Sequence, residues 1–149
     1  MTCRFTEMLT GRGFVLLSEE RITLSKLRFD KAKECLSDAA LLAENESYKS
    51  LANRSYYAVF HAIRAVLALD GFDSKKHSGV IAEFQKQYIK NGTFDKEMSA
   101  IVRRLFLARN NSDYDDFFVI AKDDAIKQYN DACMFLDEIG KFLNNEYQK

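Results

Sequence analysis

The chain has 149 residues, which is enough for one domain with its own core but short for two. Its 22 basic and 22 acidic residues cancel, so it has no overall positive field of the kind by which general nucleic-acid-coating proteins gather phosphate, and any contact with nucleic acid has to be local. A hydrophobic content of 47% argues against disorder, and no apolar run approaches the roughly 20 residues that cross a bilayer, so we expect no membrane segment.

The beginning of the chain differs from the rest. Residues 1–17 contain two glycines and little periodicity, which predicts a loose N-terminal extension followed by a single helical domain over residues 18–149. Proline is absent, and four of the six glycines fall where a helical pattern has ended: Gly11, Gly13, Gly71 and Gly92. Because helix-breaking residues are so sparse, we expect long helices.

Apolar residues recur at steps of three and four in five segments and predict helices over about residues 27–43, 47–69, 74–90, 95–109 and 125–143. No segment has the alternation of a strand. The second predicted helix is apolar over more than half of its circumference, so several neighbours should cover it. We therefore predict an all-α, up-and-down bundle of four to five helices with this helix at its centre.

The remaining sector of the second predicted helix is polar. At 100° per residue, about a quarter of the circle holds Asn53, Arg54, Tyr57, His61 and Arg64. Spacing alone favours a solvated face with one aromatic ring across it. The functional alternative is a cleft or dimer seam in which the arginines and the histidine meet phosphate, since a guanidinium group matches phosphate oxygens bidentately.

The segment after the fourth predicted helix, residues 109–116, is rich in residues that bond to their own backbone and leave helices. If the helix continued, Arg109 and Asp113 would form an ordinary ion pair, worth a few tenths of a kcal/mol. If the chain turns instead, Arg109, Asn110 and Tyr114 would converge, with a guanidinium to hold a phosphate, an amide to orient it and a phenol to transfer a proton. The acidic residues nearby would repel a polyanion unless Arg109 alone faces it.

Other kinds of site find less support. Neither His61 nor His77 has a metal-ligand partner at helical spacing, so we expect no metal and no cofactor. The three cysteines are odd in number and far apart, which fits a reducing cytoplasm better than a disulfide framework. Cys35 and Cys133 fall on or beside apolar stripes and are expected in the core. There is no glycine-rich phosphate loop and no serine elbow.

Three segments in a fixed order carry a family resemblance: residues 53–62 (NRSYYAVFHA), residues 76–80 (KHSGV), and Arg109 followed five positions later by Tyr114-Asp115. They resemble the HEPN domain, and in particular its UPF0332-like branch, over about residues 18–143. The resemblance implies a helical bundle that commonly dimerises and is often encoded beside a minimal nucleotidyltransferase, as a toxin and antitoxin pair. Several HEPN proteins are metal-independent ribonucleases.

The ribonuclease motif of that family is an arginine, usually followed by a polar residue, with a histidine a few residues beyond and two copies facing each other across the dimer. Carried over, Arg109 and Asn110 match, whereas Tyr114 stands in the place of the histidine. An unperturbed phenol, with a pKa near 10, is mostly a donor where an imidazole would shuttle protons. In related pairs the partner enzyme adenylylates a tyrosine, which makes Tyr114 the expected modification site. His61 would replace the missing histidine if the bundle brought it to Arg109.

The resemblance leaves two functions open, and periodicity alone does not exclude a plain bundle with polar groups only at its surface. The first is a toxin-like member of a HEPN/nucleotidyltransferase pair, with metal-independent ribonuclease activity through Arg109, Asn110 and Tyr114. In that reading the nucleotide or RNA contacts are Asn53, Arg54, Tyr57 and His61. The second is a non-catalytic, dimeric helical module that binds a nucleotide or a nucleotidyltransferase and cuts nothing.

Overall fold

The computed structural model describes the backbone of residues 11–149 and the side chains of residues 18–149. This part of the chain contains only helices: α1 (Gly11–Glu44), α2 (Tyr48–Leu69), α3 (His77–Phe84), which continues into one turn of π-helix, η2 (Gln85–Ile89), α4 (Lys96–Tyr114) and α5 (Lys122–Tyr147). No strand occurs within it. The predicted all-α bundle is confirmed.

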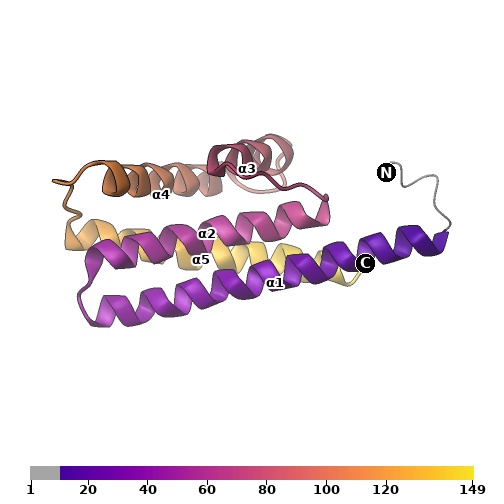
Figure 1. Cartoon of the computed structure of the whole chain (residues 1–149), viewed down its shortest axis with the longest axis horizontal. Coiled ribbons are helices and arrows are strands. Elements are labelled where there is room, and N and C mark those ends of the chain that lie inside the picture. The colour runs from indigo at the N-terminus through magenta and orange to yellow at the C-terminus, as the bar shows by residue number, and fades with distance from the viewer. Residues whose placement is uncertain (1–10) are drawn as a thin grey trace.

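Helix α2 lies at the centre of the bundle, as its wide apolar face predicted. Figure 1 shows α1, α2 and α5 running along the length of the molecule, with α3 and α4 on the other side of α2, and α2 packs against all four of these helices. Fully buried alanines at positions 58, 62 and 65 let neighbouring helices approach closely. Because other helices surround α2, side chains of those helices can reach its polar residues.

Helix α1 is longer than predicted. It begins at Gly11 rather than near residue 27, so the expected extension of residues 1–17 overlaps the helix at residues 11–17, and residues 1–10 lie outside the described part. Apolar periodicity did not predict a helix around Ser25, because the buried side chain at that position is a hydroxyl. Ser25 Oγ donates to the carbonyl of Ala65 at 2.7 Å and lies 2.7 Å from the Tyr147 hydroxyl, which joins α1 to α2 and α5.

Helix α5 places one face against the core. Its buried residues are Ala125, Ala132, Phe135, Leu136, Ile139 and Leu143. All six lie within the predicted helix of residues 125–143, whose apolar steps of four and three run through Tyr129, which is only half-buried, and pass over Phe135. The Phe135 ring is fully buried, 5.9 Å from the ring centroid of Phe84 in α3. Aromatic packing thus joins α5 to the α3 side of the bundle.

Two glycines end helices in the left-handed region, as predicted from their positions. Gly71 has φ 74° and Gly92 has φ 84°. A Cβ added at Gly71 would lie 2.8 Å from the Arg21 guanidinium, whereas a Cβ at Gly92 would meet nothing within 4 Å. A residue with a Cβ would have the same unfavourable backbone conformation at both positions, so alanine variants at the two glycines can be compared directly.

Alanine at either glycine should lower the free energy of unfolding by roughly 1–2 kcal/mol, the cost of a left-handed residue with a Cβ. The atoms that crowd Gly71 are the end of the flexible Arg21 side chain, so Arg21 should swing aside and the two variants should lose similar amounts in urea denaturation. A much larger loss in Gly71→Ala would show that Arg21 is held in place.

Candidate functional site

Helix α4 continues through the polar segment that was expected to end it. It ends at Tyr114 rather than near residue 109, and Arg109 Nε lies 2.9 Å from Asp113 Oδ2, which is the ion pair expected for a continuing helix. Five residues turn a helix by about 140° beyond one full turn, so Arg109 and Tyr114 project from different sides of α4. The expected turn that would gather Arg109, Asn110 and Tyr114 in one chain does not occur.

A different face of α4 carries Asn110 and Tyr114. Leu107, Asn110 and Tyr114 follow each other at helical steps of three and four, so they share one side of the helix. Leu107 is 60% exposed and Tyr114 is 84% exposed. This side of α4 therefore presents a leucine and a phenol to the surroundings, with the Asn110 amide between them.

Arg109 points toward α2 and meets Tyr57 of the polar strip. Its Nη2 donates to the Tyr57 hydroxyl at 3.4 Å, and its guanidinium carbon lies 5.8 Å from the centroid of the Tyr57 ring. The Arg54 guanidinium lies 5.1 Å from the same ring. Two cations from two helices thus lie close to one phenol ring, and we call Arg54, Tyr57, Arg109 and Asp113 the Tyr57 site.

The Arg54 guanidinium is fixed without a carboxylate. Asn53 Oδ1 accepts hydrogen bonds from Arg54 Nε at 3.2 Å and from Nη2 at 2.9 Å, and Arg54 Nη1 lies 3.9 Å from Cys35 Sγ. Within the described residues, no carboxylate lies at ion-pair distance from Arg54. An immobilised and unneutralised guanidinium has the charge and geometry that a phosphate group requires.

Charge at the Tyr57 site is net positive, because two guanidinium groups face the single carboxylate of Asp113. The Arg109–Asp113 contact is close, yet Arg109 Nε is buried without a well-aligned hydrogen bond in the described structure. At the other end of the polar strip, Arg64 and Arg28 also share one carboxylate oxygen, Asp73 Oδ2, at 3.1 Å each, so both of those guanidinium groups have an acidic partner. At the Tyr57 site, Arg54 has no such partner in the described structure.

Of the two histidines, His61 lies beside Tyr57, with ring centroids 6.0 Å apart, but does not contact Arg109 in the described structure. It is only 8% exposed, and burial, followed by the nearby charges of Lys31 and Arg64, lowers its pKa to about 4. The contacts of Arg109 in the described structure are with Tyr56, Tyr57 and Asp113, and none involves His61. The structure therefore gives no support to His61 as a substitute for a motif histidine.

His77 is connected to the site, which sequence reasoning missed. Its Nδ1 lies 2.7 Å from the Tyr56 hydroxyl, and its ring stacks on Phe60 with centroids 4.0 Å apart. Tyr56 falls on the wide apolar face of the second predicted helix, and periodicity does not show which residue of α3 faces it. The only sequence signal was the KHSGV segment of residues 76–80.

Comparison with known proteins identifies the family. Residues 25–142 match the family model described as "HEPN domain". The chain belongs to the HEPN family. It is 36% identical over 115 residues to a "UPF0332 protein" of Thermotoga maritima, which covers 77% of this chain and 87% of the relative. It is 34% identical over 119 residues to a "UPF0332 protein" of Archaeoglobus fulgidus, covering 80% and 94%. A Methanocaldococcus jannaschii protein named "Putative toxin MJ0605" is 33% identical over 112 residues, covering 75% and 83%.

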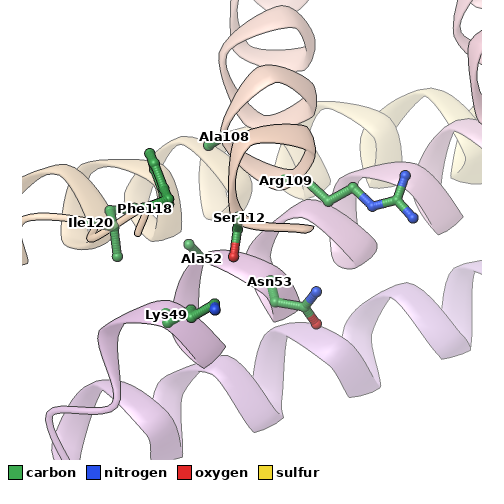
Figure 2. Close-up of a pocket in the computed structure, with 8 residues that line it drawn as sticks. All are labelled: Lys49, Ala52, Asn53, Ala108, Arg109, Ser112, Phe118 and Ile120. Atoms are coloured by element: carbon green, nitrogen blue, oxygen red, sulfur yellow. The ribbon is translucent and has the colours of Figure 1, made fainter. Parts of the chain in front are cut away.

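This HEPN chain has a hollow beside the Tyr57 site, between the start of α2 and the end of α4. Figure 2 shows its lining, which consists of Lys49, Ala52, Asn53, Ala108, Arg109, Ser112, Phe118 and Ile120. An open groove of about 390 Å³ shares Lys49, Asn53 and Ser112 with it and adds Arg54 and Asp113. Lys49, Asn53 and Tyr57 follow at steps of four, so Lys49, which the sequence analysis did not single out, extends the polar strip by one turn.

Other classes of site are not formed by the described residues of this HEPN chain. No three His, Cys, Asp or Glu side chains among them gather closely enough to hold a metal ion. Cys35 is buried, which raises the pKa of its thiol, and Cys3 lies outside the described residues. Within the same part of the chain, every helix is too short or too polar to cross a bilayer.

Proposed function

We propose that this HEPN chain is the toxin-like component of a HEPN/nucleotidyltransferase pair and that it cleaves RNA as a cytoplasmic homodimer without a metal ion. The observation that carries the proposal is the approach of the Arg54 and Arg109 guanidinium groups to the same Tyr57 ring, with a single carboxylate, Asp113, paired to Arg109. The HEPN match and the name of the Methanocaldococcus jannaschii relative support a toxin-like role.

In this proposal Arg109 holds the phosphodiester that is cut. A phosphate oxygen replaces the Asp113 carboxylate, and the guanidinium stabilises the negative charge that grows on the phosphate as the reaction proceeds. Arg54, held by Asn53, takes a neighbouring phosphate oxygen, and Tyr57 donates from its hydroxyl or stacks on a base. His61 was predicted to share this role, but its burial removes it from direct contact with RNA.

Asn110 and Tyr114 act from the second copy of the chain. Their face of α4 is exposed and includes Leu107, which favours its burial against another helix. A two-fold contact along this face would bring the Tyr114 of one copy toward the Arg109 of the other, so that the site is completed by dimerisation. Tyr114 would then donate a proton, and Asn110 would orient the phosphate.

The first test is cleavage of RNA by purified wild-type protein in the presence of a chelator. We expect cleavage to persist in the chelator and expression of the protein to slow cell growth. A wild-type protein that binds RNA and leaves it intact would favour the alternative function, a non-catalytic dimeric module. The Asp113 carboxylate already paired with Arg109 is the observation that favours that alternative.

The proposed partner gives a second prediction. When the nucleotidyltransferase encoded beside this chain is supplied with ATP, the Tyr114 oxygen should attack the α-phosphorus, pyrophosphate should leave, and the protein should gain the mass of one or more AMP groups. Tyr114 is suited to this reaction because it is 84% exposed. Mass spectrometry should find the added mass in wild type and in Tyr48→Phe, the matched control, and not in Tyr114→Phe. Unchanged modification of Tyr114→Phe would rule out this position.

A further inference from the structure

We infer that His77 is the general base of the proposed RNA-cleavage site, where it takes the role of the histidine that is absent from the end of α4. The inference rests on the proposed function. His77 begins α3 and lies far from Arg109 in the sequence, yet both side chains contact the same two aromatic residues of α2.

The shared neighbours are Tyr56 and Tyr57. The His77 ring centroid lies 5.9 Å from that of Tyr56 and 5.8 Å from that of Tyr57. The Arg109 guanidinium carbon lies 5.6 Å and 5.8 Å from the same two centroids. A phosphate held by Arg109 would therefore lie close to the same two rings that the imidazole contacts.

The imidazole is oriented in the way that a general base requires. Its Nδ1 is bound to the Tyr56 hydroxyl at 2.7 Å, and its ring is stacked on Phe60, so the ring has little freedom to turn. His77 Nε2 has no hydrogen-bond partner among the described residues and is not among their buried unpaired atoms, so solvent reaches it. In the tautomer that carries its proton on Nδ1, Nδ1–H donates to the Tyr56 hydroxyl, and the unprotonated Nε2 is open to a substrate.

The surroundings also keep this imidazole neutral. Burial is the largest cause that lowers the pKa of His77, followed by the positive charges of Arg109 and Arg64. The titratable and charged groups near it are Tyr56, Tyr57, His61 and Arg64 from α2 and Arg109 from α4, and none of them is a carboxylate. Burial raises the pKa of Tyr56, so its phenol stays protonated and remains a fixed partner of Nδ1. His77 is therefore unprotonated at neutral pH and able to accept a proton.

The reaction that these groups support is transfer of the phosphodiester to the neighbouring 2′-oxygen. His77 Nε2 takes the proton of the 2′-hydroxyl as that oxygen forms a bond to phosphorus. The bond between phosphorus and the 5′-oxygen breaks, and the 5′-oxygen keeps the electron pair and takes the proton of the Tyr114 phenol of the second copy. The imidazolium then gives its proton to that phenolate through water, which restores both groups, and the products are a 2′,3′-cyclic phosphate and a 5′-hydroxyl.

The test compares His77→Asn with His61→Asn, a matched variant that removes the imidazole that does not contact Arg109 in the described structure. His77→Asn should cut RNA at least about 100-fold more slowly, the usual contribution of a general base, while its Kd for RNA stays within about 2-fold of wild type. His61→Asn should retain cleavage. The wild-type kcat/KM should rise with pH up to an apparent pKa below 6.5, because only the unprotonated imidazole is active, and this acid limb should be absent in His77→Asn.

The outcomes distinguish a failure of the inference about His77 from a failure of the proposed function. If wild type cleaves RNA, Arg109→Ala does not, and His77→Asn cleaves normally, the inference about His77 fails and the proposed function stands. If wild type cuts nothing, the proposed function fails and the base role fails with it. NMR of the wild-type protein gives a test that does not need a stable variant. Binding of an uncleavable 2′-deoxy oligonucleotide should raise the pKa of His77, because a phosphate beside Arg109 offsets the positive charge of the guanidinium. An unchanged pKa would overturn the inference.

Discussion

The Arg109→Ala variant should cleave RNA at least about 100-fold more slowly than wild type, because it loses the guanidinium that stabilises charge on the reacting phosphate. Arg109 is the cation of the Tyr57 site that comes from α4, and no other basic side chain of that helix contacts Tyr57 in the described structure. Arg109→Lys keeps the charge but loses the fork of parallel donors, so it should recover only part of the rate. Initial rates on a labelled RNA give the comparison directly.

Arg103→Ala is the matched control for this prediction. Arg103 lies on the same helix, is exposed, and donates from Nη1 to Ser99 Oγ at 2.9 Å without any contact with the Tyr57 site. It removes the same charge, so it should weaken RNA binding slightly at low salt and leave the rate at saturating RNA unchanged. Equal losses in Arg103→Ala and Arg109→Ala would mean that only overall charge matters.

Phe135→Ala should lower the free energy of unfolding by about 3–5 kcal/mol, because the surrounding helices cannot close the cavity left by a fully buried ring. The Phe135 ring is 0% exposed and packs against Phe84 across the bundle. Phe117→Ala removes the same group from a position that is 93% exposed and should change stability by less than about 0.5 kcal/mol. Urea denaturation of both variants measures the difference. Similar losses in the two variants would contradict the position of Phe135 in the core.

Apolar periodicity predicted where the helices are and which one is central, because burying a stripe on a helix requires large residues at steps of three and four. The prediction was wrong where a polar group takes part in the packing and where a polar segment remains helical. Ser25 secures α1 through a buried hydroxyl network, which hydrophobicity does not register. Residues 110–114 were expected to leave α4 because their side chains compete with the backbone, yet they remain helical.

The site was predicted only as separate pieces. Arg54 and Tyr57 share a helix, so their proximity follows from the helical repeat, and the Arg109–Asp113 pair was foreseen as the outcome of a continuing helix. The approach of Arg109 to Tyr57 and of His77 to Tyr56 depends on how α3 and α4 sit on α2. Apolar periodicity predicts which face of a helix is buried. It does not predict how the covering helix is rotated about its axis or how far it is shifted along it.

The Arg109–Asp113 ion pair sets a threshold for what can occupy the site. A single small anion, such as chloride, would gain one ion pair at Arg109 and displace another, so its net gain is close to nothing. A string of phosphates reaches further, to Arg54 and Lys49, neither of which pairs with a carboxylate in the described structure. Each of those contacts is gained without displacing another. In the proposed function, the aspartate therefore favours, at Arg109, a ligand that carries several charges along its length over a single small ion.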